Sequence, residues 1–273
     1  MSVDTSIRST PLAPTARGLA MPIVLSPLWR WPQLIGCHLA ALILAATWLC
    51  SPTRALWDRL DILLFRMLNG SLDFGHGWQL FWAYANWRPV DGLAAVVLLL
   101  VFIHSIRRDE RMLQLALWSY LLLIGLCVII VKPITLLLLH DTLEYYRPSP
   151  TLMVDASLRL SALVPTVSAK DASPWCFPSD HGFVLLTFTS MYWYLGRRRA
   201  AVTASFIALL FTLPRMVSGA HWATDTLVGG AVMTLVATSW VFATPLHHHV
   251  ARLCFPLVRR FDAVLPPWQT GPP

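Results

Sequence analysis

The sequence predicts an all-α protein, a bundle of six transmembrane helices with one amphipathic helix at the membrane interface. Of the 273 residues, 56% are hydrophobic and only 13% are charged, whereas soluble domains carry roughly 25% charged residues. The mean hydropathy is +0.59. Long apolar runs alternate with short clusters of arginine, which is typical of a chain that crosses a membrane several times.

Six apolar runs predict the membrane spans. They cover 34–50, 90–106, 112–131, 182–195, 200–213 and 223–243. The third run is interrupted at Lys132-Pro133, so its outer end stays open. The spans predict one domain at 31–245. It lies between a tail at 1–30, whose polar composition predicts disorder, and a second polar tail at 246–273.

Residues 51–89 predict a helix that does not cross the membrane. Charged side chains, including Asp58, Arg59, Asp61 and Arg66, alternate with apolar positions at helical spacing. The apolar positions are Leu56, Leu60, Leu63, Leu64, Met67 and Leu68. This two-faced pattern predicts an amphipathic helix that lies in the membrane interface.

The distribution of basic residues predicts the orientation of the bundle. Six spans place both termini on one side. The tails and loops on that side carry twelve of the 21 basic residues but only four of the 14 acidic ones. Positive charge marks the cytoplasmic side of a membrane protein. We therefore expect a multi-pass protein of the cell (inner) membrane, with cytoplasmic termini and its polar motifs at the extracytoplasmic face.

One of these polar motifs is Pro214-Arg215 followed by His221 and Asp225, the spacing R-x5-H-x3-D. In a helix, residues four apart share a face, so the carboxylate of Asp225 can reach the imidazole of His221. A carboxylate there holds one ring nitrogen protonated and leaves the other free to attack a substrate. This spacing predicts a nucleophilic histidine.

A second polar motif, Pro178-Ser179-Asp180-His181-Gly182, precedes an apolar run. Ser179 is a favourable N-cap, and the free N–H groups that follow such a cap attract anions. His181 is then placed to protonate a leaving oxygen. Asp180 would repel a phosphate, and its expected role is a favourable interaction with the helix N-terminus.

Three cations are predicted at the same face, namely Lys132, Arg147 and Arg215. Arginine provides forked hydrogen bonds to phosphate and lysine a point charge. The basic residues form no continuous stripe, and there is no Gly-rich phosphate loop and no zinc-type cysteine spacing, which argues against nucleic acid as a partner. The five cysteines suggest no disulfide framework.

Together these motifs resemble the type 2 phosphatidic acid phosphatase family, whose pattern is K-x6-RP, then PSGH, then SR-x5-H-x3-D. This chain shows Lys132 and Arg147-Pro148, then Pro178-Ser179-Asp180-His181, then Pro214-Arg215, His221 and Asp225. The order, the membrane side and the spacing of the last motif match. The motifs extend over about 95 residues, and the six-span layout extends the likeness over most of the chain.

The resemblance implies a role for each site residue. His221 would form a phosphohistidine, oriented by Asp225, and His181 would be the general acid and later the base that activates water. The phosphoryl oxygens would be bound by Lys132, Arg147, Ser179 and Arg215, with Asp180 and Gly182 as further candidates. The family pattern implies no metal and no cofactor.

The chain departs from the family pattern in three places. Fourteen residues instead of six separate Lys132 from Arg147, and the six-residue register would put His140 in the place of the lysine. We favour Lys132, because an inserted segment can fold away while the lysine stays at the end of the span. Asp180 replaces the usual glycine, as in the undecaprenyl diphosphate phosphatase branch, and Pro214 replaces a serine.

The sequence therefore predicts a membrane lipid phosphatase that hydrolyses a phosphate or diphosphate monoester, with undecaprenyl diphosphate as the preferred substrate. A phosphotransferase that passes the phosphoryl group to a lipid such as lipid A is one alternative. Hydrolysis of lipid A phosphates or phosphatidylglycerophosphate is another. A non-catalytic lipid-binding or transport protein is an alternative of a different class. The expected partners are the lipid substrate and membrane lipids, and the oligomeric state stays open.

Overall fold

The computed structural model describes residues 28–107, 109, 111–250 and 253. Within these residues the chain forms helices and no strand, apart from a single β-bridge between Trp87 and Ala169. The predicted all-α class is therefore confirmed. The disorder predicted for 1–30 and most of the predicted C-terminal tail fall outside the described residues.

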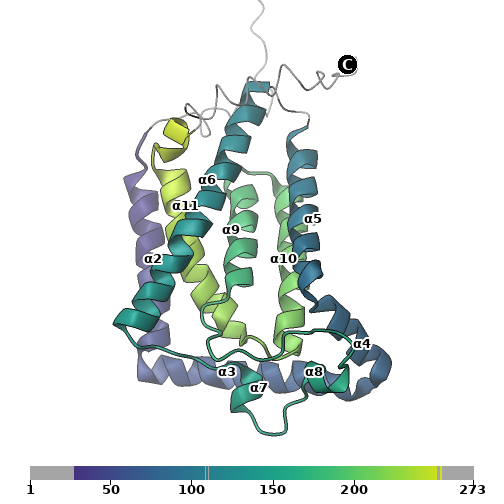
Figure 1. Cartoon of the computed structure of the whole chain (residues 1–273). Helices are drawn as coiled ribbons and strands as arrows, with labels where there is room; N and C mark the ends of the chain where they lie inside the picture. The colour runs from purple at the N-terminus through teal and green to yellow at the C-terminus, as the bar shows by residue number, and fades with distance from the viewer. Residues whose placement is uncertain (1–27, 108, 110, 251–252, 254–273) are drawn as a thin grey trace, which may run out of the picture.

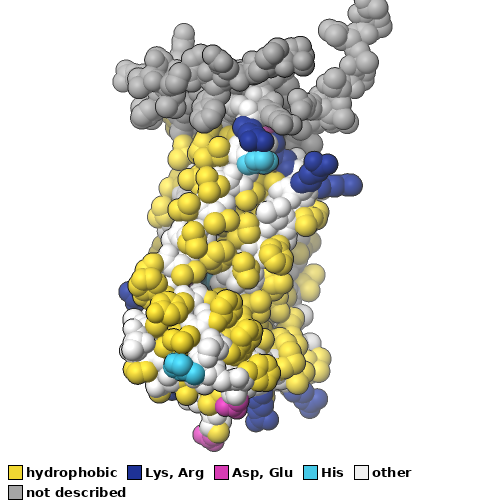
Figure 2. Space-filling view, turned by 90° about the vertical axis from the view of Figure 1, so that its right-hand side faces the viewer, with side chains coloured by type: hydrophobic (Ala, Val, Ile, Leu, Met, Phe, Trp, Pro, Cys, Tyr) yellow, Lys and Arg dark blue, Asp and Glu magenta, His cyan; other side chains and the backbone are white. Residues whose placement is uncertain are grey.

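Five helices are long and apolar enough to cross a membrane. They are Trp31–Leu49 (α2), Arg88–Ile106 (α5), Ala116–Thr142 (most of α6 and the π-helix η2), Arg198–Val217 (α10) and Asp225–Ala243 (the π-helix η3 and α11). Large apolar side chains such as Leu42, Ile129 and Phe206 are exposed on their outer faces. Figure 2 shows hydrophobic side chains covering the middle of one face, with charged side chains gathered toward its ends. Lipid is the solvent that suits such a surface.

The sixth predicted span corresponds to α9, Asp180–Tyr194, which has only 15 residues. At 1.5 Å per residue it is about 22 Å long. A helix needs roughly 20 residues to span a membrane, which is more than α9 has. It lies beside α10, α11 and α6 and runs along the bundle (Figure 1). The six-span count therefore stays a prediction, while a bundle with five candidate spans is what the structure contains.

The outer end of the third apolar run, which the sequence left open, lies beyond Lys132-Pro133. Helix α6, Arg111–Leu136, continues through Pro133, and η2 extends it over Leu137–Thr142. A proline removes one backbone hydrogen bond, but long apolar helices tolerate this loss when neighbouring groups satisfy the freed carbonyls. Lys132 is therefore part of a continuous helix, and His140 lies in the π-helical turn beyond it.

The predicted amphipathic helix is present as α3, Ser51–Gly70, which lies across one end of the bundle together with α4, His76–Ala85 (Figure 1). Leu56, Leu63 and Met67 are exposed, as expected of a lipid-facing side. Asp61, one of the charged positions of this pattern, is buried together with Phe65 and Asn69. The bundle covers this stripe of α3, while Arg59 and Arg66 are exposed.

The start of α2 and the end of α11 lie at the opposite end of the bundle from the polar motifs (Figure 1). The backbone N–H of Arg30, just before α2, donates to the carbonyl of Ala243 at the end of α11 (2.8 Å). At the other end, the segment between η2 and α9 folds over α3 and contains the short helices α7, Pro150–Met153, and α8, Leu160–Leu163. A 3-10 turn, Ser71–Phe74 (η1), joins α3 to α4.

Candidate active site

A tight turn after α10 places His221. The backbone N–H groups of Ala220 and His221 both donate to the carbonyl of Arg215, at 3.0 and 3.2 Å. Gly219 has a φ of +72°, and a Cβ there would lie 2.6 Å from Cγ2 of Thr151. Only glycine suits both demands, so the chain reverses directly behind the histidine.

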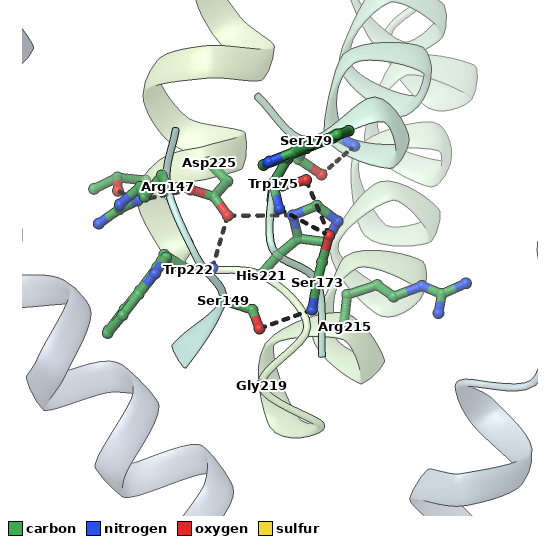
Figure 3. Close-up of polar contacts among 12 residues, drawn as sticks. Arg147, Ser149, Ser173, Trp175, Ser179, Arg215, Gly219, His221, Trp222 and Asp225 are labelled. Carbon is green, nitrogen blue, oxygen red and sulfur yellow. Dashed lines mark hydrogen bonds and ion pairs between the residues drawn. The ribbon is translucent and has the colours of Figure 1, made fainter. Parts of the chain in front are cut away.

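Asp225, the first residue of η3, holds the ring of His221 (Figure 3). Its Oδ2 lies 3.2 Å from Nδ1 of His221 and accepts the N–H of Trp222 at 2.9 Å. Its Oδ1 accepts from Nη1 of Arg147 at 2.7 Å. A carboxylate accepts and does not donate, so Nδ1 carries the proton and Nε2 keeps its lone pair. The predicted pairing of His221 and Asp225 is thus present in the structure.

The Pro178–Gly182 motif meets the His221 motif directly. Ser179 caps α9, and its hydroxyl accepts the N–H of Gly182 at 3.1 Å. Its own backbone N–H donates to the carbonyl of Asp225 at 3.0 Å. A Cβ on Gly182 would lie 2.6 Å from Thr226. Gly182 therefore allows the close approach of α9 and η3, and its N–H is already bound by Ser179.

His181 and Arg215 share a carboxylate that the motifs did not indicate. Nε2 of His181 lies 3.1 Å from Oδ1 of Asp91, and Nη2 of Arg215 lies 2.6 Å from Oδ2. Asp91 lies in the first turn of α5. An acid inside an apolar span is a recognised sign of a functional position, and this signal could have identified Asp91 from the sequence.

Lys132 and His140 are the two candidates for the lysine position of the K-x6-RP pattern. Of these, Lys132 contacts the Pro178–Gly182 motif. Its Nζ lies 2.6 Å from Oδ2 of Asp180, which also gives Asp180 a partner beyond the helix N-terminus. The ring of His140 instead stacks on Tyr146, with centroids 5.1 Å apart, and lies 5.3 Å from the ring of Trp175. Among the described residues, Nε2 of His140 has no hydrogen-bond partner.

Arg147 is held by carboxylates. Nη1 bonds Asp225, and Nη2 lies 2.6 Å from Oδ2 of Asp61. The guanidinium also lies 4.6 Å from the ring centre of Trp48 and 5.0 Å from that of Trp222. Burial alone would lower the pKa of Arg147, but Asp225 and Asp61 outweigh it and raise the pKa. Arg147 is thus beside the nucleophile, on the opposite side of His221 from Arg215 in Figure 3.

Lys170 is a further cation near the site that sequence reasoning missed. Its backbone carbonyl accepts from Nδ2 of Asn86 at 2.6 Å and from the hydroxyl of Ser218 at 3.1 Å. Burial lowers the pKa of its ammonium, the nearby Arg215 lowers it further, and Asp180 raises it. Lys170 therefore lies within electrostatic range of both motifs. It comes from an irregular segment without periodicity, which is why no pattern indicated it.

One group of side chains among the described residues has the types and spacing of metal ligands. Cys176, His221 and Asp225 offer atoms that all lie within 4.8 Å of one another. A thiol binds metal as the thiolate. Burial raises the pKa of the Cys176 thiol, and the neighbouring Asp225 raises it further. The protonated thiol and the existing bond between His221 and Asp225 make this trio a poor fit for a metal ion.

Comparison with known proteins assigns the domain. Residues 116–248 match the model of the PAP2 superfamily. The chain is 29% identical over 243 residues to lipid A 1-diphosphate synthase of Escherichia coli (strain K12), a match that covers 86% of this chain and 94% of that protein. No solved structure gives a significant match. The two histidine motifs, Arg147 and Lys132 all fall inside the matched region, and residues 116–248 thus form a domain of the PAP2 superfamily.

Proposed function

We propose that this protein moves the terminal phosphoryl group of a membrane lipid through a phosphohistidine at His221. The observation that carries the proposal is the orientation of His221. Its Nδ1 is held by Asp225, so the lone pair of Nε2 is the nucleophile. His181, Ser179 and Arg215 come from other helix ends to the same place.

In the first step, Nε2 of His221 attacks the terminal phosphorus of the donor lipid, and the bond from phosphorus to the bridging oxygen breaks. The leaving oxygen takes a proton from His181, whose ring also contacts Asp91. Arg215 and the backbone N–H groups at the start of α9 stabilise the charge that develops on the phosphoryl oxygens. Asp225 stabilises the imidazolium. A diphosphate donor carries extra negative charge, which Lys132 and Lys170 are placed to meet.

In the second step, an acceptor oxygen attacks the phosphohistidine, passes its proton to His181 and restores His221. The similar protein from E. coli is named as the enzyme that makes lipid A 1-diphosphate. Because this chain spans 94% of it, we propose that lipid A is the acceptor and undecaprenyl diphosphate the donor. Hydrolysis, with water as the acceptor, is the second candidate, and the likeness of Asp180 to the diphosphate phosphatase branch favours it.

We place the reaction at the extracytoplasmic face of the cell membrane, with both termini in the cytoplasm. Support comes from the excess of basic residues near the termini. The polar motifs lie at the opposite end of the bundle (Figure 1). An accessibility assay with a membrane-impermeant thiol reagent on single cysteines introduced near Gly196 and near Asp155 tests this orientation.

The acceptor is tested with purified protein and a donor labelled in its terminal phosphate. Transfer predicts that label appears in lipid A when lipid A is supplied, with little release as free phosphate. Hydrolysis predicts free phosphate at the same rate with and without lipid A. A protein that binds or transports lipids without catalysis would release no label and would form no phosphohistidine.

Substitution can identify which residue fills the lysine position of the K-x6-RP pattern. We expect Lys132→Ala to raise the KM for the lipid by about tenfold, since one charged contact to phosphate is worth roughly 1.5 kcal/mol. His140→Ala is the matched control and should leave KM unchanged, because its ring contacts Tyr146 and Trp175. Steady-state kinetics with the labelled donor measures both. The reverse pattern would assign the position to His140.

We expect the reaction to need no divalent ion. Charge neutralisation comes from arginine, lysine and helix N–H groups, and the protonated Cys176 thiol disfavours a metal at the nucleophile. Activity should therefore be unchanged after dialysis against EDTA. Loss of activity that returns with added zinc or magnesium would contradict this prediction.

A further inference from the structure

Asp61 is a buried acid that takes no direct part in the proposed chemistry. It lies on α3, and only 1% of its surface is exposed. Its oxygens accept from Nη2 of Arg147 at 2.6 Å, from the N–H of Thr224 at 3.0 Å and from the Thr224 hydroxyl. A buried carboxylate is costly unless donors surround it, and its donors come from Arg147, which bonds Asp225, and from Thr224, which precedes Asp225.

The contacts of Asp61 continue without a break to His221. Nη1 of Arg147 bonds Asp225 at 2.7 Å, and Asp225 bonds Nδ1 of His221 at 3.2 Å. Thr224 precedes Asp225 and accepts a hydrogen bond from Nη1 of Arg147 at 3.0 Å. Both terminal nitrogens of the guanidinium are thus held by acceptors inside the protein.

We propose that Asp61 is a positioning residue for phosphoryl transfer. It holds Arg147 against Asp225 and so keeps Asp225 aimed at His221. This inference rests on the proposed function. Asp61 lies outside residues 116–248, which match the PAP2 superfamily, so the amphipathic helix α3 contributes a residue that the matched domain does not contain.

The physical effect of Asp61 is a balance of charge around Arg147. With Asp61 present, the guanidinium is shared between two buried carboxylates. Without its charge, the whole positive charge acts on Asp225 and weakens the negative field on the imidazole. The other titratable groups that face this cluster are Asp58, 3.7 Å from Nη2 of Arg147, and Cys176, beside Asp225.

Asp61→Asn tests the proposal in the full-length protein. We expect phosphohistidine formation at His221, followed in a single turnover with labelled donor, to slow by about 10–100-fold, the usual cost of losing a group that orients a reacting residue. KM should stay unchanged, because Asp61 is buried and Arg147 keeps its charge and its bond to Asp225.

Asp73→Asn is the matched control. Asp73 is an exposed acid in η1, just after α3, and its substitution removes the same charge without touching the site. A wild-type rate in Asp61→Asn would overturn the proposal. So would a slower rate that comes with a raised KM and a lower melting temperature, which indicates a structural role only.

Two further results keep the test decisive. If Asp61→Asn does not fold, Thr224→Val removes one donor to Asp61 and keeps its charge. Thr224→Val should slow the reaction, but by less than Asp61→Asn, and should leave KM unchanged. A wild-type rate in Thr224→Val would overturn the proposal. Absence of phosphohistidine in the wild-type protein would instead contradict the proposed function itself.

Discussion

His221→Ala is expected to abolish phosphoryl transfer, with a loss on the order of 10⁶-fold, the size seen when an enzyme loses its nucleophile. The variant has no Nε2 to accept the phosphoryl group. The fold should persist, because the backbone N–H of His221 still bonds the carbonyl of Arg215 and the N–H of Trp222 still bonds Asp225. Acid-labile label on the protein, trapped during turnover, measures the effect.

His104→Ala is the control for this experiment. His104 is an exposed histidine in the last turn of α5, at the opposite end of the bundle from Asp91, and it should keep wild-type activity and labelling. Retention of activity in His221→Ala would rule out the covalent mechanism. Label that persists on another residue of that variant would move the nucleophile elsewhere.

The helices were largely predictable because each depends on local patterns. Apolar runs of membrane length predict α2, α5, α10 and α11. The alternation of leucine and charge predicts α3. The sequence leaves a point open where local rules compete. Pro133 left the outer end of the third run undecided, and the apolar context carries the helix through it.

The nucleophile pair was predictable because its spacing is short. His221 and Asp225 are four residues apart, so one helical turn brings them together. The pairing of Lys132 with Asp180 was not predictable from spacing, because these residues are 48 positions apart. The resemblance to a family predicted that both residues belong to one site. The structure adds the ion pair between Nζ of Lys132 and Oδ2 of Asp180.

Asp61 was missed for a physical reason. It lies 86 positions from Arg147 in the chain, on a helix whose charged residues all fit a solvated face. Only the packing of α3 across the bundle end buries the stripe that holds Asp61, while Arg59 and Arg66 are exposed (Figure 1). Burial of a charge depends on tertiary structure, so an amphipathic pattern cannot distinguish a solvated aspartate from a buried one.

Asp225→Asn is expected to lower the transfer rate by about 10⁴-fold, the size found when the aspartate of a Ser-His-Asp triad becomes asparagine. The carboxylate accepts three hydrogen bonds, from His221, Trp222 and Arg147. An asparagine has only one accepting oxygen. If its NH₂ faces Arg147, two donors oppose each other. If its NH₂ faces His221, Nδ1 must accept, the proton moves to Nε2, and the nucleophilic lone pair is lost.

The size of this loss relative to that of Asp61→Asn distinguishes direct from indirect action. Asp225 touches the ring, whereas Asp61 acts through Arg147, so the Asp225 variant should be slower by about two to three orders of magnitude. Because both residues bond the same guanidinium, their effects should not add. Single-turnover rates of the two single variants and the double variant measure the coupling. Additive losses would mean that Arg147 does not transmit the influence of α3 to the nucleophile.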